Sequence, residues 1–360
     1  MWEVSELVIA FVISCVTTLI ITPFIMKLAI KVKAVDKPNN KRKMHQAPKP
    51  SMGGLAIFIG VAAGFIYLQP VHAQLNAVII GACVMIITGI LDDIFELKAI
   101  YKLAGQITSA VVVVSSGLVI DKLTMPFIGT VYLEGFGIVL TIFWIVAASN
   151  AINLIDGLDG LAAGVSAIAL SSILVMALID YRIVVVYLSI ILIGSCVGFL
   201  FYNFHPSRIF MGDTGALFLG YAIAIVSMLG LFKNVAFFSF IVPVIVLAIP
   251  IFDTIHAIIR RKVNKQSIAT ADTKHIHYQL MNMGYSHRAS VLIIYGFSIF
   301  FGFMAVVFNS ATLLTSLIVL GIIILAIQLI AEIAGITLHH RRPILDGLRR
   351  VVGVKREKKL

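Results

Sequence analysis

The sequence predicts an all-α protein, a polytopic transmembrane helical bundle of about eleven spanning helices with its N-terminus outside and its C-terminus in the cytoplasm. Three observations lead to this prediction. Of the 360 residues, 60% are hydrophobic and only 12% are charged, whereas a soluble protein averages about 25% charged residues. Long apolar runs recur along the chain, and Lys and Arg gather in alternate loops between them. We therefore expect an integral membrane protein.

Eleven apolar runs are long enough to cross the bilayer, which takes roughly 17 to 25 helical residues. They are residues 4–30, 52–68, 75–91, 103–120, 136–154, 158–179, 183–201, 214–232, 235–258, 289–308 and 311–337. The first run begins beside Glu3 and Glu6 rather than a basic stretch, so we predict a spanning helix and no cleaved signal peptide. Residues 1–338 are expected to form one transmembrane domain, and residues 339–360 a basic cytoplasmic tail.

The distribution of Lys and Arg predicts the orientation of the bundle. Of the 28 Lys and Arg residues, 24 fall on one predicted face, three fall on the other and Lys27 lies inside the first run. The positive-inside rule makes the 24-charge face cytoplasmic. The net charge of +11 is thus explained by orientation and by attraction to anionic lipid headgroups, and no nucleic-acid partner is expected. The three cysteines lie inside apolar runs, where Cys behaves as a small hydrophobe.

Asp92 and Asp93 end the third run, on the predicted cytoplasmic face. Two acids at a helix C-terminus oppose the helix dipole, which favours a functional role over simple interfacial charge. Adjacent helical residues point about 100° apart. We therefore expect one carboxylate to face a ligand while the other supports it.

A second acidic cluster follows the fifth run and meets the same face. Asn150, Asn153, Asp156 and Asp159 recur every three residues, so on a helix they trace one broad side. The glycine that follows each of the two acids loosens the backbone, and irregular backbone at membrane depth is tolerated only beside protein or a polar cavity. A loop with helix caps would explain only part of this pattern, so we predict the wall of a pocket.

Asp213 stands between glycines at the start of the eighth run. A carboxylate there is either a helix cap or an anchor for Mg²⁺, which prefers one or two carboxylates plus substrate phosphate. The other acids on the same face favour the metal.

Several basic residues lie on the same predicted face. Lys102, one turn into the fourth run, is expected within reach of Asp92 and is a candidate phosphate clamp. His275 and His277 lie in a loop and suit oxyanions better than zinc, because nothing nearby completes four ligands. His45 lies in a basic loop that either grips phosphate or follows the positive-inside rule, and Asp253 is expected to support the site from behind.

Acids on one face, a divalent ion and nearby cations are what phosphoryl transfer requires. A membrane location indicates a lipid substrate, and the cytoplasmic face indicates a nucleotide-activated one. A transporter for an anionic metabolite would bind near the bilayer midplane between repeats, and no repeat is visible. A CDP-alcohol phosphotransferase would require an Asp-Gly-x-x-Ala-Arg pattern, and the stretch that begins at Asp156 lacks the Arg.

The chain resembles the polyprenyl-phosphate N-acetylhexosamine-1-phosphate transferase family over nearly its whole length. The shared motifs are His45…Pro48…Gly53-Gly54, Asp92-Asp93, Lys102-x-x-x-Gln106, Asn150 to Gly160, Phe210 to Gly215 and the His275 loop. Among the branches it looks most like bacterial enzymes that use UDP-N-acetylglucosamine and undecaprenyl phosphate, especially those that open wall teichoic acid synthesis. It departs from the common His-Ile-His-His form by having Tyr278 last.

The resemblance implies that Asp213 binds Mg²⁺ together with Asn153, with Mn²⁺ as an alternative ion. It implies that Asp156 and Asp159 line the uridine pocket and that Lys102 meets phosphate. The expected substrate-binding residues are Asn150, Asn153, Asp156, Asp159, Lys102, His45, His275 and His277, of which the last two reach the sugar-phosphate end. The expected partners are a UDP-amino sugar and the membrane-borne lipid phosphate, and a homodimer is kept as an alternative to a monomer.

The resemblance also implies that the lipid phosphate attacks the β-phosphorus of the sugar nucleotide and releases UMP. Asp92 is then a base, an orienting group or, in a two-step scheme, a nucleophile. We prefer direct attack, because a phosphate monoester with a second pKa of about 6 is largely dianionic at neutral pH. Asp92 and Asp93 would orient the lipid phosphate, and with Asp213 they form the expected catalytic group.

Overall fold

The computed structural model describes residues 3–36, 48–125, 129–230, 240–263, 265 and 275–333. The elements within these ranges are α1 (Val4–Lys31), β1 (Val35–Asp36), β2 (Lys49–Pro50), α2 (Gly53–Leu68), α3 (Leu75–Phe95), α4 (Ala99–Ser115), β3 (Lys122–Met125), β4 (Gly129–Tyr132), α5 (Gly135–Ile155), α6 (Leu161–Ile179), α7 (Ile183–Asn203), α8 (Gly212–Gly230), α9 (Ile241–Val246), α10 (Ala248–Val263), α11 (Ile276–Asn282), α12 (His287–Asn309) and α13 (Leu313–Ile333). The strands form two short antiparallel pairs, β1 with β2 and β3 with β4. The predicted all-α class is confirmed.

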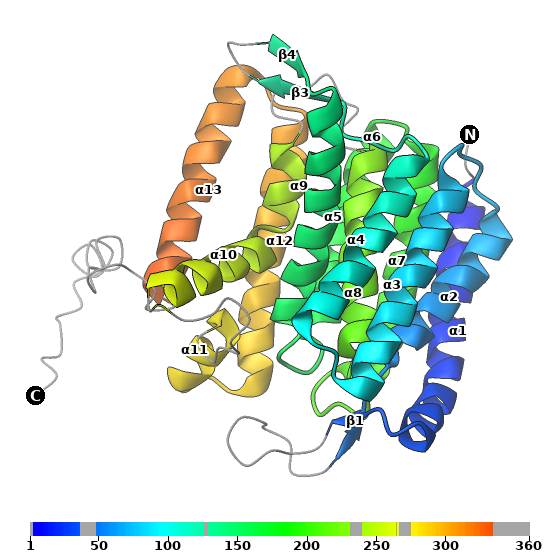
Figure 1. Cartoon of the computed structure of the whole chain (residues 1–360). Helices are drawn as coiled ribbons and strands as arrows, with labels where there is room; N and C mark the ends of the chain where they lie inside the picture. The colour runs from blue at the N-terminus through cyan, green and yellow to red at the C-terminus, as the bar shows by residue number, and fades with distance from the viewer. Residues whose placement is uncertain are drawn as a thin grey trace, which may run out of the picture.

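Eight described helices are long and apolar enough to cross a membrane: α1, α3, α5, α6, α7, α8, α12 and α13. Helices α2 and α4 are apolar but shorter. Ten of the eleven predicted runs therefore coincide with one helix each, and the chain is a multi-pass membrane protein. The long helices run side by side, with β3 and β4 at one end of the bundle and β1 at the other (Figure 1). The count of eleven spans and the outside N-terminus stay predictions.

The ninth predicted run, residues 235–258, is not one continuous helix in its described part. It is divided at Leu247 into α9 and α10, and α10 lies across the direction of its neighbours (Figure 1). Pro243 and Pro250 flank the break, and each removes one backbone donor from a helical ladder. Helix α10 also buries Asp253 and leaves apolar side chains such as Ile259 exposed. A hydropathy window cannot separate such a bent, amphipathic pair of helices from a straight span.

Helix α8 is the centre of the bundle. Every residue from Thr214 to Gly230 is buried, and the helix packs against α3 and α5 along their length and against α2. Small residues make this packing close: a Cβ added at Gly54 or Gly89 would collide with backbone atoms of Thr214 or Gly215. Small residues are common where membrane helices approach each other closely. They therefore position the start of α8 between α2 and α3.

The N-terminus of α8 is capped by a carboxylate from another helix. The Asp93 side chain accepts hydrogen bonds from the backbone N–H of Asp213 at 2.9 Å and of Thr214 at 3.1 Å. It also accepts from the Thr214 hydroxyl at 2.6 Å and the Ser51 hydroxyl at 3.1 Å. A carboxylate satisfies the unpaired N–H groups of a helix start and is favoured there by the helix dipole. Asp93 thus ties the end of α3 to the start of α8.

We predict that Gly89→Ala lowers the melting temperature of the purified protein, because the new Cβ would force α3 away from the backbone of Thr214. Overpacking of this kind costs about 1–3 kcal/mol. The matched control is Gly296→Ala in α12, where a Cβ has open space. Thermal unfolding in detergent measures both variants, and equal melting temperatures for the two would contradict the close packing of α3 on α8.

Candidate active site

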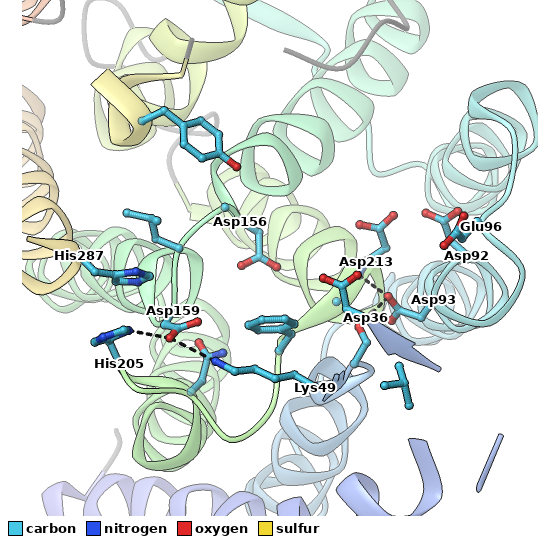
Figure 2. A pocket seen from close by; sticks show the side chains of 18 residues that line it. Asp36, Lys49, Asp92, Asp93, Glu96, Asp156, Asp159, His205, Asp213 and His287 are labelled. Carbon is cyan, nitrogen blue, oxygen red and sulfur yellow. Dashed lines mark hydrogen bonds and ion pairs between the residues drawn. The ribbon is translucent and has the colours of Figure 1, made fainter. Parts of the chain in front are cut away.

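One pocket opens at the end of the bundle that carries β1 and β2. Its cavity measures about 510 Å³, a volume typical of small-molecule sites. The lining comes from the two strands, the ends of α3 and α7, the α5–α6 turn, the α7–α8 loop, the starts of α8 and α12, and α11 (Figure 2). The lining residues are Val35, Asp36, Lys49, Ser51, Asp92, Asp93, Glu96, Asp156, Gly157, Leu158, Asp159, Asn203, His205, Phe210, Gly212, Asp213, Tyr278 and His287. All three acidic clusters singled out in the sequence converge here.

The ammonium group of Lys102 stands beside the acidic side of the pocket. It forms ion pairs with Asp92, at 3.0 Å, and with Asp213, and it donates a hydrogen bond to the side-chain oxygen of Asn153 at 3.2 Å. The Asn153 amide donates to the other carboxylate oxygen of Asp213 at 2.5 Å. Residues from α3, α5 and α8 therefore place oxygen atoms around one cation from α4. The expected closeness of Lys102 to Asp92 is met.

Asp92 and Asp93 face different partners, as their helical spacing predicts. One oxygen of Asp92 accepts from the backbone N–H of Leu97 at 2.8 Å, and the other faces Lys102. The oxygens of Asp93 are both engaged with the start of α8 and with Ser51. Asp92 is thus the one that interacts with the cation, and Asp93 positions the helix that carries Asp213.

Asn150 lies behind the pocket rather than in its lining. Its amide donates to Gln106 at 2.9 Å and to the backbone oxygen of Val146 at 2.8 Å, and the Gln106 amide donates back at 3.3 Å. This exchange joins α5 to α4, the helix that carries Lys102. Asn150 therefore acts through the arrangement of the helices. The next two residues of the three-residue spacing, Asp156 and Asp159, lie in the turn after this helix, because α5 ends at Ile155.

Asp156 follows the end of α5, and its carboxylate points into the pocket between Asp213 and Asp159 (Figure 2). Burial raises the pKa of this carboxyl to about 8, and the negative charges of Asp213, Asp93 and Asp159 add to the effect. A carboxylate in these surroundings is stabilised when a cation binds beside it. Asp156 is therefore placed to respond to a cationic ligand.

Asp159 is buried at the other side of the pocket, where hydrogen-bond donors surround its carboxylate. Its oxygens accept from the Ser207 backbone N–H at 3.0 Å and the Ser207 hydroxyl at 2.7 Å, and they contact His205 Nδ1 at 2.8 Å. Lys49 Nζ lies 3.7 Å away. Burial raises the pKa of the carboxyl, but the bonds from Ser207 and His205 and the charge of Lys49 outweigh it, so the pKa lies below its usual value.

The ligand atoms of Asp159, His205 and His287 lie within 4.8 Å of one another, close enough for a transition metal to be considered. The two imidazole rings stack with their centroids 4.1 Å apart. The carboxylate already accepts three hydrogen bonds and has Lys49 as its counter-ion. Because the charge is balanced, we interpret this cluster as a hydrogen-bonded network and not as a metal centre.

His275 is buried against α10. Its Nδ1 contacts the Asp253 carboxylate at 2.8 Å, and the same carboxylate accepts from the backbone N–H of Ile276 at 3.0 Å. Asp253 therefore caps α11 and holds His275 away from the pocket lining. These contacts are consistent with the expected supporting role of Asp253. His275, which was expected to bind substrate, is not among the residues that line the pocket.

His277 is also buried, and its two ring nitrogens have no hydrogen-bond partner among the described residues. Burial lowers the pKa of its imidazole to about 4, so the ring is neutral. A Cβ added at Gly157 would meet this ring. His277 thus packs behind the α5–α6 turn, and the neighbouring Tyr278, rather than His277, lines the pocket.

One predicted site residue, His45, lies outside the described residues, as does the predicted tail 339–360. Other residues of the pocket were not predicted from the sequence. The charged and histidine lining residues that were not among the predicted site residues are Asp36, Lys49, Glu96, His205 and His287. None of them belongs to a spaced motif. Lys49 shares the short stretch with Pro50 and Ser51 that leads into α2, and this position beside a family motif was the one available signal.

Comparison with known proteins finds related sequences along most of the chain. Residues 75–231, which include the three acidic clusters, match the model of glycosyl transferase family 4. The chain is 49% identical over 352 residues to a probable undecaprenyl-phosphate N-acetylglucosaminyl 1-phosphate transferase of Bacillus subtilis, which covers 96% of this chain and 97% of the relative. It is 35% identical to a decaprenyl-phosphate N-acetylglucosaminephosphotransferase of Mycolicibacterium smegmatis, over 81% of this chain and 79% of the relative.

A third similar protein is the undecaprenyl-phosphate alpha-N-acetylglucosaminyl 1-phosphate transferase of Escherichia coli K12, which is 30% identical over 75% of each chain. All three of these relatives are named as polyprenyl-phosphate sugar-phosphate transferases, and each matches three quarters or more of this chain. The chain belongs to glycosyl transferase family 4. It is a transferase, as the sequence motifs predicted.

We predict that Asp156→Asn stabilises the protein against heat at pH 8 and above in the presence of a chelator. The folded-state pKa of Asp156 is raised to about 8, so ionisation costs the wild type stability as the pH rises from about 4 through 8. The variant does not carry this cost. Melting temperatures measured from pH 5 to 9 should therefore diverge in favour of the variant as the pH rises. A difference that shrinks with rising pH would contradict the assignment.

Proposed function

We propose that the chain transfers N-acetylglucosamine 1-phosphate from UDP-N-acetylglucosamine to undecaprenyl phosphate and releases UMP. The observation that supports this most strongly is the convergence of Asp92, Asp156 and Asp213 in one polar pocket at the end of an apolar bundle, with Lys102 beside it. A pocket in this position can meet a lipid phosphate from the membrane and a nucleotide from water. The name of the Bacillus subtilis relative supports the choice of acceptor and of sugar.

We propose Mg²⁺ as the ion that assists the reaction, with Mn²⁺ as the alternative. The oxygens of Asp92, Asp213 and Asn153 surround the Lys102 ammonium, so this position favours positive charge. Carboxylate and carboxamide oxygens suit Mg²⁺, which also binds substrate phosphate. Asp213 and Asn153 would hold the ion, which when bound neutralises charge on the diphosphate. Lys102 adds a second positive charge beside the same oxygens.

The chain's residues act mainly by positioning. An oxygen of the lipid phosphate attacks the β-phosphorus of the donor, and the bond to UMP breaks, so that UMP leaves with that electron pair. The attacking phosphate is already largely dianionic at neutral pH, and no side chain needs to remove a proton. Asp92 then fixes Lys102, at 3.0 Å, and orients the acceptor. Asp93 holds the start of α8, which presents Asp213.

We further propose that the pocket faces the cytoplasm of a bacterial cell, where nucleotide sugars are found. The 24 Lys and Arg residues on this predicted face support the orientation. The product would be a lipid-linked sugar diphosphate for a cell-wall polymer, wall teichoic acid. Another UDP-N-acetylhexosamine, for peptidoglycan or a different envelope polysaccharide, is the alternative. A metabolite transporter is less well supported, because the pocket lies at helix ends and not at the midplane.

The test is UMP release by the purified protein. With UDP-N-acetylglucosamine, undecaprenyl phosphate and Mg²⁺ we expect UMP and a lipid-linked product, and a chelator should stop the reaction. Omission of the lipid should abolish UMP release, and a burst of UMP without lipid would contradict direct attack. If no UDP-amino sugar in a panel yields UMP, the proposed donor and reaction are wrong.

Asp213→Ala should reduce turnover by about 100-fold or more, because loss of even an outer-shell partner of a metal ligand costs about 10- to 100-fold and Asp213 would bind the ion directly. The matched control is Asp121→Ala, an exposed acid beside β3 at the opposite end of the bundle. UMP formation is measured for both variants over a range of Mg²⁺ concentrations. Wild-type turnover in Asp213→Ala would refute the assignment of Asp213 to the metal.

A further inference from the structure

The pocket lining is strongly acidic for a site that would take an anionic donor. Its seven carboxylates belong to Asp36, Asp92, Asp93, Glu96, Asp156, Asp159 and Asp213. Among the lining residues in the described part of the chain, Lys49 is the sole Lys or Arg. A diphosphate requires positive charge close to its oxygens. One divalent ion beside Asp213 would meet part of this requirement.

Lys102 is not placed to supply the remaining positive charge that the diphosphate requires. Its ammonium group is held between Asp92, Asp213 and Asn153, and it is not among the lining residues. Any phosphate contact of Lys102 therefore belongs to the side of the pocket where the ion would bind. A second cation is needed at the opposite side, where Asp159 lies.

Lys49 occupies that side on a short, well-defined element. It belongs to β2, which pairs with β1, and its side chain is 22% exposed. Its Nζ donates to the Ser207 hydroxyl at 2.9 Å and lies 4.9 Å from the centre of the Phe210 ring. Its distance to the Asp159 carboxylate, 3.7 Å, is longer than a hydrogen bond. The ammonium is thus fixed in position but keeps donors for another partner.

Asp159 is the anchor of this arrangement. Three hydrogen bonds from Ser207 and His205 already occupy its oxygens. A carboxylate has about four acceptor positions, so little capacity remains for a ligand. His205 is itself held, since its ring stacks on His287 and its backbone oxygen accepts from Arg288 Nε at 3.2 Å.

We propose that Lys49 is the residue that contacts an anionic oxygen of the sugar nucleotide at this side of the pocket, and that Asp159 and His205 are positioning residues that hold it. The inference deepens the proposed function and rests on it. It differs from the family-based expectation that Asp159 itself contacts the nucleotide. The ligand class is a nucleoside diphosphate sugar, recognised through its phosphate charge.

The test compares Lys49→Met and Lys49→Arg in the full-length protein in detergent. Loss of one hydrogen bond to a charged group should raise the KM for UDP-N-acetylglucosamine about tenfold or more, with kcat little changed, because binding is lost equally in the ground and transition states. Lys49→Arg should recover most of this loss. The KM of the wild type should also rise with salt more steeply than that of Lys49→Met.

The matched control is Lys122→Met in β3, at the opposite end of the bundle (Figure 1). It should keep the wild-type KM and salt dependence. Melting temperatures of all variants show whether each is folded. If folded Lys49→Met keeps the wild-type KM, the inference is overturned, and so it is if Lys49→Arg fails to recover binding while Lys122→Met behaves like the wild type.

His205 gives an independent readout of positioning. His205→Asn retains a donor where Nδ1 contacts Asp159, whereas His205→Ala removes it. We expect His205→Ala to raise the KM for the sugar nucleotide and His205→Asn to restore it, with no change in the KM for the lipid acceptor. Equal KM values for the two variants would contradict the positioning role.

The proposed function and the role of Lys49 fail in different ways. If the wild type releases no UMP from any UDP-amino sugar, the proposed function fails and the role of Lys49 fails with it. If the wild type releases UMP but Lys49→Met has an unchanged KM, the inference alone is wrong. Calorimetric titration of each protein with UDP tests the role of Lys49 without turnover. The inference predicts that UDP binds more weakly to Lys49→Met than to Lys122→Met.

Discussion

The hydrogen bonds from the start of α8 to Asp93 are the contact on which the pocket depends. Helix α8 is buried along its length, and a buried helix start must find partners for its free N–H groups. Asp93 supplies them from α3. Asp213, whose backbone N–H is one of the capped groups, then directs its side chain at Lys102 and Asn153. One structural requirement, the capping of a central helix, thereby positions an acid for chemistry.

The same contact explains why two adjacent acids end α3. A single carboxylate could not both cap α8 and face the pocket's cation, because adjacent helical side chains diverge by about 100°. Asp93 takes the first task and Asp92 the second, at 3.0 Å from Lys102. The close packing at Gly89 keeps α3 near enough to α8 for this division. The separate roles of Asp92 and Asp93 therefore depend on the close packing of α3 against α8.

Much of the fold could be predicted from composition, and the convergence of the acids could be predicted from their positions at the ends of the apolar runs. Two kinds of feature could not. The bend at Leu247 depends on how Pro243 and Pro250 act within a packed bundle, and hydropathy averages over it. The contacts of Lys49 and His205 with Asp159 join residues far apart in the sequence. Motif spacing reports neighbours along one helix, so it identified Asp159 and missed its partners.

The two sides of the pocket differ in how their charge is balanced. Around Asp213 two carboxylates share the single ammonium of Lys102, which leaves a negative excess that a divalent ion can neutralise. Around Asp159 one carboxylate meets one ammonium and three hydrogen bonds, and the balance is complete. Buried charge is costly unless it is paired, so the balanced side is stable without a ligand. The unbalanced side is therefore the one whose stability changes most when an ion binds.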